Sequence, residues 1–372
     1  MTENKKYNPN NFSALHAAVA FLLFWAMNLV LGEILLGLSK IPAVEKFLSD
    51  EYAEMCVSLV LMALGLFLIV WSMSKILKVN PVSGGGFLLR KSSAAEIVMT
   101  FVLFFGLCGL LLPVSETFSE NWEIFRYQGL HLPRPAEPEV EGSAWVLLAI
   151  LLIPVLPAIF EELLFRGVIL RGLLQFGKVP AVLLSAFVFA LAHGSYQQFI
   201  YQFIVGIMLG CLFVETKNIA VSMAGHFANN FFASWVLSIV YASAGTGPNA
   251  EVYIAIADIM FALIGTACVV SAFLYFGKRI VSRAKNGAEE TDPNVVSTMS
   301  AYGENGEPIT IETPWYQTVE LTLPLQQRRE FQTKKGMAKI NKKASAAVAI
   351  VLLGLGIAFG LFTFVISIVV PY

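Results

Sequence analysis

Long apolar runs, separated by shorter polar stretches, occupy most of this chain. A helix that crosses the hydrocarbon core of a bilayer needs about 20 apolar residues. Nine runs reach or approach that length, at 12–38, 55–74, 96–114, 143–166, 179–194, 197–214, 219–241, 252–275 and 344–370. The fifth run is short. The pattern predicts an all-α fold, a polytopic integral membrane helical bundle with about eight or nine transmembrane helices.

The composition agrees with a membrane protein, because 57% of the residues are hydrophobic and only 14% are charged. Soluble domains carry roughly 25% charged residues. The net charge of −1 argues against nucleic acid as a partner and leaves the lipid bilayer as the expected surroundings. The first run is too long for the apolar part of a signal peptide and has no evident small-x-small cleavage site, so we expect it to stay as a span.

Lysine and arginine residues follow alternate runs along the chain. They cluster after the second, fourth, sixth and eighth runs, whereas segment 115–142 is rich in glutamate and 242–251 has no lysine or arginine. Cytoplasmic loops carry the excess of positive charge, so the basic loops and the N-terminus are predicted to be cytoplasmic. The polar N-terminus, read as uncleaved and free of a targeting signal, favours a bacterial plasma membrane.

One long polar stretch interrupts the apolar pattern. It divides the chain into a transmembrane helical domain at 1–285, a cytoplasmic polar segment at 286–343 and a C-terminal transmembrane helix at 344–372. Residues 309–312 alternate as a strand does. A unit this short buries little core, so we expect either a partly disordered segment with a small hairpin or a small folded subdomain.

Six polar side chains lie inside or beside three of the apolar runs. They are Glu161, Glu162, Arg166, His193, His226 and Asn230. A charge at the bilayer centre costs roughly 2.5–3.5 kcal/mol on insertion scales, so such groups are usually paired, face a cavity and carry function. These residues are therefore the candidate chemistry of the chain.

Helical spacing separates the two adjacent carboxylates. Glu161 and Glu162 point about 100° apart on a helix, so they cannot address the same spot. Arg166 lies four residues after Glu162, a spacing at which acid and base pair well. We therefore expect Glu162 to pair with Arg166, which leaves Glu161 free to face a cavity.

The other two segments also place polar groups on one helical face. Phe189 and His193 are four residues apart, as are His226 and Asn230. A carboxylate close to a histidine can polarise water for attack on a peptide carbonyl. A second histidine with an asparagine amide can donate hydrogen bonds to the oxyanion that forms. Together, the glutamate, the two histidines and the asparagine are suited to the hydrolysis of a peptide bond.

The three motifs EExxxR, FxxxH and HxxxN, in this order on successive spans, resemble those of the CAAX prenyl protease and bacteriocin-processing (CPBP, Abi) family. Members of that family are multi-helix intramembrane endopeptidases, and some are tied to bacteriocin processing or immunity. The resemblance covers about 143–241. It implies a catalytic Glu161 with His193 activating water and His226 and Asn230 stabilising the oxyanion, supported by Glu162, Arg166 and a packing Phe189.

Other functions also fit these residues. The same protease could depend on zinc held by Glu161, His193 and His226, although the chain has no HExxH motif. Buried Glu, His and Asn sets also occur in transporters, and a non-catalytic immunity or binding protein could keep the fold. The leading version needs no cofactor. Its substrate would be a peptide or a membrane protein: a prenylated C-terminal peptide, a bacteriocin leader or a transmembrane regulator.

The protease interpretation makes a geometric demand. If the fourth helix ended at Arg166 and the fifth began near Val179, then Glu161 and His193 would be about 20 Å apart in depth, at roughly 1.5 Å per residue. The two side chains meet only if the fourth helix continues towards Leu174 and tilts, or kinks at Pro154 and Pro157.

Overall fold

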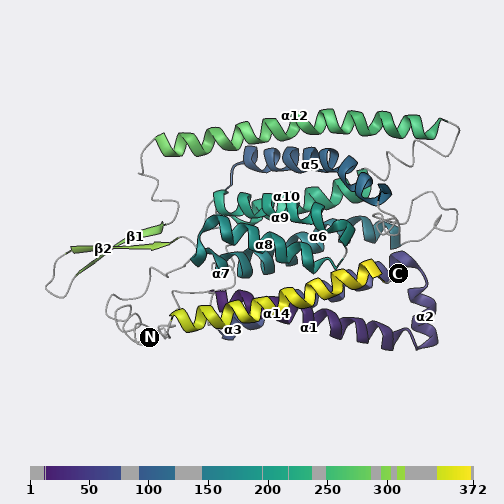
Figure 1. Cartoon of the computed structure of the whole chain (residues 1–372), viewed down its shortest axis with the longest axis horizontal. Coiled ribbons are helices and arrows are strands. Elements are labelled where there is room, and N and C mark those ends of the chain that lie inside the picture. The colour runs from purple at the N-terminus through teal and green to yellow at the C-terminus, as the bar shows by residue number, and fades with distance from the viewer. Residues whose placement is uncertain are drawn as a thin grey trace.

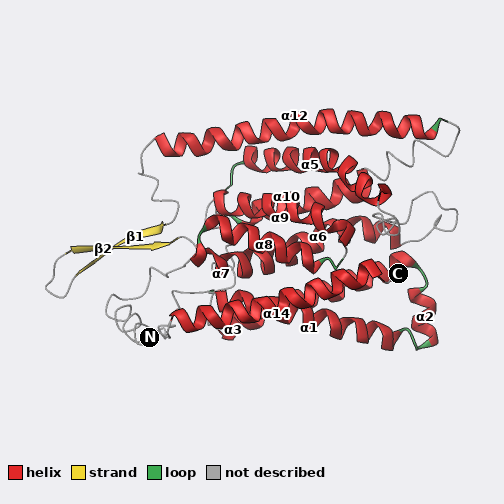
Figure 2. Ribbon diagram, viewed as in Figure 1, coloured by secondary structure: helices red, strands yellow, loops and turns green. Residues whose placement is uncertain are grey.

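The computed structural model describes residues 12, 14–76, 92–121, 145–194, 196–216, 218–236, 249–285, 295–302, 308–314 and 342–369. In this part of the chain the helices run side by side in a bundle (Figure 1). The strands described form one two-stranded sheet outside the bundle (Figure 2). The predicted polytopic helical class is confirmed, with this small sheet as an addition to it.

Each of the nine predicted runs contains a helix. They are α1 (Ala14–Leu38), α3 (Glu51–Ile76), α5 (Ala94–Asn121), α6 (Trp145–Leu164), α8 (Lys178–Ala192), α9 (Tyr196–Thr216), α10 (Ile219–Phe231), α12 (Ala250–Lys285) and α14 (Lys342–Val369). A short helix, α2 (Pro42–Leu48), follows α1. Among the described residues, seven helices are long and apolar enough to span a membrane. The shorter ones are α8, with 15 residues, and α10, with 13.

The predicted end of the fourth span at residue 166 is wrong. Helix α6 passes directly into the π-helix η2 (Phe165–Leu170), the short α7 (Arg171–Leu173) and the 3-10 turn η3 (Leu174–Phe176). The apolar span therefore reaches from Trp145 to Leu173. Hydropathy alone ended the span at Arg166, whereas the Arg166 side chain is buried by neighbouring helices.

The chain then turns back sharply into α8. Gly177 has φ of 102°, a conformation that favours glycine, and it separates η3 from α8. The extended fourth span and the reversal at Gly177 let α8 run back alongside it, which is the continuation that the protease interpretation requires.

The helices that carry the three motifs lie inside the bundle. Helix α12 forms one outer layer and packs on α5, which in turn packs on α10. Helix α10 packs on α6, and α6 on α3, while α1 and α14 pair on the other side. Helix α8 pairs with α9 and contacts η2. The arrangement shields α6, α8 and α10 behind other helices.

The largest apolar core joins α1, η2 and α8. The Phe24 ring meets the Phe165 ring edge-on at 5.9 Å between centroids, and Phe165 meets Phe189 in the same way at 5.1 Å. All three side chains are buried. Edge-to-face pairs of this kind add roughly 0.5–1.5 kcal/mol each beyond the burial of their area. They fix Phe189, which borders the polar site.

The strands β1 (Val295–Tyr302) and β2 (Pro308–Pro314) pair in antiparallel register. The predicted β-like alternation at 309–312 lies in β2. The rest of the predicted polar segment, at 286–294, 303–307 and 315–341, lies outside the described residues. So do most of the loops from which the orientation in the membrane was predicted.

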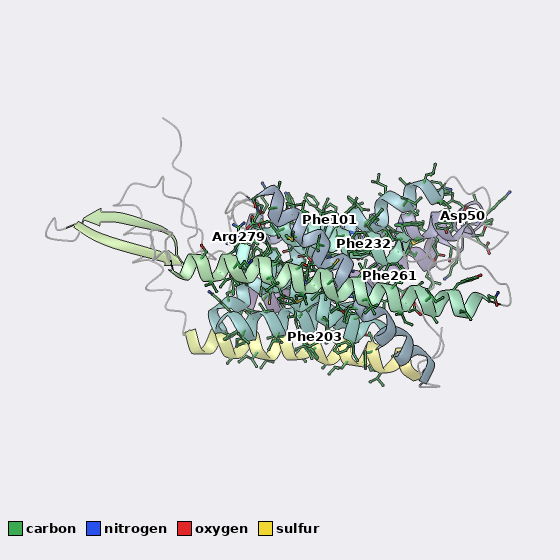
Figure 3. All side chains as sticks on the ribbon, turned by 90° about the horizontal axis from the view of Figure 1, so that it is seen from above. Asp50, Phe101, Phe203, Phe232, Phe261 and Arg279 are labelled. Atoms are coloured by element: carbon green, nitrogen blue, oxygen red, sulfur yellow. The ribbon has the colours of Figure 1, made fainter. Side chains whose placement is uncertain are left out.

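Polar contacts tie three helix ends together on the hairpin side of the bundle. Near the end of α12, Arg279 pairs with Glu96, at the start of α5, at 3.0 Å. The Asn218 amide before α10 donates to the Ser92 hydroxyl at 2.9 Å. Figure 3 shows Arg279 near this end of the bundle and Asp50 at the other.

Helices α5 and α12 touch through glycines. A Cβ atom added at Gly265 would lie 2.7 Å from the Gly106 carbonyl oxygen, and one added at Gly106 would lie 2.7 Å from the Gly265 oxygen. At Gly109 the same atom would lie 2.6 Å from the Phe261 oxygen. Small residues permit such close approach of membrane helices, where packing rather than the hydrophobic effect drives association.

The substitution Gly265→Ala should destabilise the protein by about 1–3 kcal/mol, because the new methyl group meets a backbone oxygen that moves only if the helices separate. Thermal unfolding of the purified protein in detergent measures this as a lower Tm. The matched control is Gly277→Ala on the same helix, where nothing lies within 4 Å of the added atom. Equal Tm values for the two variants would contradict the interface.

Candidate active site

A buried ion pair lies at the centre of the site. The Arg166 Nη1 group donates to Glu162 Oε1 at 2.7 Å, and both side chains are almost completely buried. The pairing predicted from the four-residue spacing is confirmed. The other terminal nitrogen of Arg166 donates to the Gly206 carbonyl of α9 at 3.2 Å, and the guanidinium lies 4.5 Å from the Phe189 ring centre. One side chain thus links the fourth span to α8 and α9.

The same Glu162 oxygen also binds His226. His226 Nδ1 lies 2.9 Å from Glu162 Oε1, and a carboxylate only accepts hydrogen bonds, so Nδ1 carries the hydrogen. The other ring nitrogen, Nε2, lies 3.9 Å from Glu161 Oε2. The carboxylate of Glu162 therefore orients the imidazole and directs its second nitrogen towards Glu161.

The two adjacent glutamates have different surroundings, as their helical positions predicted. Glu162 is fully buried, whereas the Glu161 side chain keeps 12% of its surface exposed. Among the described residues, the Oε2 atoms of both glutamates are buried without a hydrogen-bond partner, but Glu162 binds Arg166 and His226 through its Oε1. Burying an oxygen without a hydrogen-bond partner costs free energy, so such an atom in a folded protein usually has a ligand or a functional role.

His193 is held at the end of α8. Its Nδ1 lies 2.8 Å from the Phe189 carbonyl oxygen, which can only accept, so the hydrogen is on Nδ1 and Nε2 is the basic nitrogen of the neutral ring. The Phe189 ring packs edge-on against both histidines, at 4.8 Å from His193 and 5.8 Å from His226. His226 lies 3.9 Å from Glu161, so the shared Phe189 ring connects His193 on α8 with the carboxylates of the fourth span through His226.

Asn230 lies one helical turn beyond His226. Its Oδ1 accepts a hydrogen bond from Asn229 Nδ2 at 3.2 Å. Asn229 Oδ1 in turn accepts from the Tyr201 hydroxyl of α9 at 2.7 Å. Asn229 and Tyr201 are not among the residues predicted from the sequence. Asn229 could have been noticed as a second amide beside Asn230 in an apolar helix, but nothing in the sequence links Tyr201 to Asn229.

The zinc-dependent alternative requires Glu161, His193 and His226 to be grouped around one metal ion. In the part of the chain that the structure describes, no three or more His, Cys, Asp or Glu side chains are grouped so that they could hold a metal ion. Glu161, His193 and His226 are therefore not such a set as they stand. The Nδ1 atoms of both histidines already bind protein oxygens.

These features define a polytopic membrane protein with a carboxylate and histidine site shared by three interior helices. Residues 143–232 match the model of a family described as type II CAAX prenyl endopeptidase, Rce1-like. The matched range contains all three motifs, so the resemblance seen in the sequence is confirmed for this segment. No curated protein and no solved structure matched the chain.

The substitution Arg166→Ala should destabilise the protein by about 3–5 kcal/mol, because it leaves the Glu162 carboxylate buried without its cation. Denaturation of the detergent-purified protein, followed by tryptophan fluorescence, gives the free energy of unfolding. Lys46→Ala is the control, since the Lys46 side chain on α2 is exposed to its surroundings. A loss at Arg166 no larger than that at Lys46 would contradict this role.

Proposed function

We propose that the protein is an intramembrane endopeptidase of the CAAX protease type, which hydrolyses a peptide bond with water activated by Glu161 and His193. The carrying observation is the buried Glu161 oxygen without a hydrogen-bond partner, 3.9 Å from His226, with His193 packed on the same Phe189 ring as His226. It lies in the segment that matches a family of CAAX prenyl endopeptidases. The geometry and the family match support the same chemistry.

Water would bind between two acceptors. The Glu161 carboxylate accepts one hydrogen, and His193 Nε2 accepts the other, because Nδ1–H of that ring is committed to the Phe189 carbonyl. The water oxygen then attacks the carbonyl carbon of the scissile bond. One water proton passes to Glu161 and on to the leaving amine, and the hydroxyl stays on the new carboxyl group.

His226 would be the first oxyanion donor. Its Nδ1–H is bound to Glu162, which fixes the orientation of the ring, and its Nε2 lies 3.9 Å from Glu161 Oε2, on the side of the proposed water. When Nε2 carries a hydrogen, it can donate to the oxyanion of the tetrahedral intermediate.

Asn230 would supply the second oxyanion donor through its Nδ2 group. Its oxygen already accepts from Asn229, so the side chain has its donor end left for substrate. Oxyanion donors commonly contribute roughly 10²–10³-fold to kcat. Glu162, Arg166 and Phe189 act indirectly, by holding His226 and His193 in place.

The proposal includes a substrate class and an orientation. A prenylated C-terminal peptide is the first candidate, because the matched family is named for it; bacteriocin leaders and transmembrane regulators are the next. The alternation of basic loops supports a cytoplasmic N-terminus. We place the protein in a bacterial plasma membrane.

The substitution Glu161→Gln should lower kcat by roughly 10²–10⁴-fold with little change in KM, because the amide cannot take the water proton. The assay follows cleavage of an internally quenched, farnesylated peptide with a C-terminal CAAX sequence by the full chain in lipid vesicles. Glu54→Gln, an exposed glutamate of α3, is the matched control and should keep full activity. Full activity in Glu161→Ala would rule out the proposed mechanism, in which Glu161 activates the water, whereas cleavage by neither the wild type nor the variant would favour a binding or immunity protein.

Metal dependence is tested on the same vesicles. Activity should persist after chelation and dialysis, with no metal detected by mass spectrometry. Loss of activity that zinc restores would instead support the zinc-dependent version. If the farnesylated peptide is not cut, comparing protein N-termini in host membranes with wild-type protein and with Glu161→Ala identifies the substrate, and identical sets of N-termini would count against any protease.

A further inference from the structure

A directed chain of hydrogen bonds crosses from α5 through α9 to α10, next to the site. Cys108 Sγ lies 3.3 Å from the Tyr201 hydroxyl oxygen. The Tyr201 hydroxyl donates to Asn229 Oδ1 at 2.7 Å, and Asn229 Nδ2 donates to Asn230 Oδ1 at 3.2 Å. Neither Cys108 nor Tyr201 lies in one of the three sequence motifs, and Asn229 occupies a variable position of the HxxxN motif.

The direction of this chain follows from its donors and acceptors. A tyrosine hydroxyl has one hydrogen, and Tyr201 gives it to an amide oxygen, which only accepts. The Cys108 thiol is therefore the donor in its contact with Tyr201. With Asn229 Oδ1 occupied by Tyr201, the amide of Asn229 presents Nδ2 to Asn230, whose oxygen accepts.

Tyr201 is the stronger of two groups that favour this direction, because the Cys108 thiol, a weak donor, also lies 3.7 Å from Asn229 Oδ1. Two neighbouring asparagines can pair either way, because turning each amide by 180° exchanges its oxygen and nitrogen with almost no change of shape. In the reversed pair, Asn230 would give its hydrogen to Asn229 and present its oxygen to the site, where an oxyanion would be repelled. The Tyr201 hydroxyl distinguishes the two orientations because it donates to oxygen.

We infer that Tyr201 and Asn229 are positioning residues that hold the Asn230 amide with Nδ2 towards the reacting carbonyl. The inference rests on the proposed function and extends it to two residues on α9 and α10. Burial supports it, since Cys108 and Asn229 are each 2% exposed. Water is largely excluded there and has little access to replace a lost hydroxyl.

The test is Tyr201→Phe, which removes only the hydroxyl. In the peptide cleavage assay we expect kcat to fall roughly tenfold with KM little changed, a smaller effect than the loss of an oxyanion donor itself. Tyr275→Phe is the matched control, because the Tyr275 hydroxyl accepts a hydrogen bond from Arg279 near the hairpin end of the bundle. It should leave kcat unchanged.

A double-mutant cycle separates positioning from general damage. If Tyr201 acts through Asn230, then Tyr201→Phe should cause no further fall in kcat in an Asn230→Ala background. The same tenfold fall in both backgrounds would overturn the inference while the protease stands. Cleavage that does not depend on Glu161 would overturn the proposed function as well, so the two failures give different results.

Discussion

The buried pair of Glu162 with Arg166 is the interaction on which the site depends. Arg166 reaches from the fourth span to the α9 backbone and the Phe189 ring, while Glu162 holds the His226 ring from α10. A buried pair of this kind contributes little net stability over apolar packing, but breaking it is costly. Its value is geometric, because this one ion pair joins residues of four helices and fixes the direction of His226 Nε2.

The pair also explains how two adjacent carboxylates coexist in a membrane. Glu162 is neutralised by Arg166 and hydrogen-bonded by His226, so the second carboxylate, Glu161, can remain without a hydrogen-bond partner of its own. Two adjacent buried carboxylates with no cation nearby would repel each other. Arg166 and His226 therefore make it possible for this pair of glutamates to be buried together.

The spacing of residues along single helices predicted much of this site, but it did not predict the contacts between helices. The pairs four residues apart, such as Glu162 with Arg166, follow from helix geometry, and the spans follow from hydropathy. The Glu162 contact with His226 joins residues 64 positions apart, and the Tyr201 contact with Asn229 joins two different helices. Such contacts depend on how helices rotate against each other, which no single-helix pattern contains.

The end of the fourth span shows the same limit and its physical cause. Hydropathy stops a span at Arg166, because a lone arginine belongs at the membrane surface. Here the arginine lies in the π-helix η2, all six residues of which are buried by other helices. Wider π turns leave the regular backbone pattern and often occur at functional sites, and inside a bilayer such backbone is tolerated only where protein covers it. The irregular turn, the buried charge and the extra helical length are therefore one feature, and it is the surrounding helices that permit the span to continue past Arg166 to Leu173.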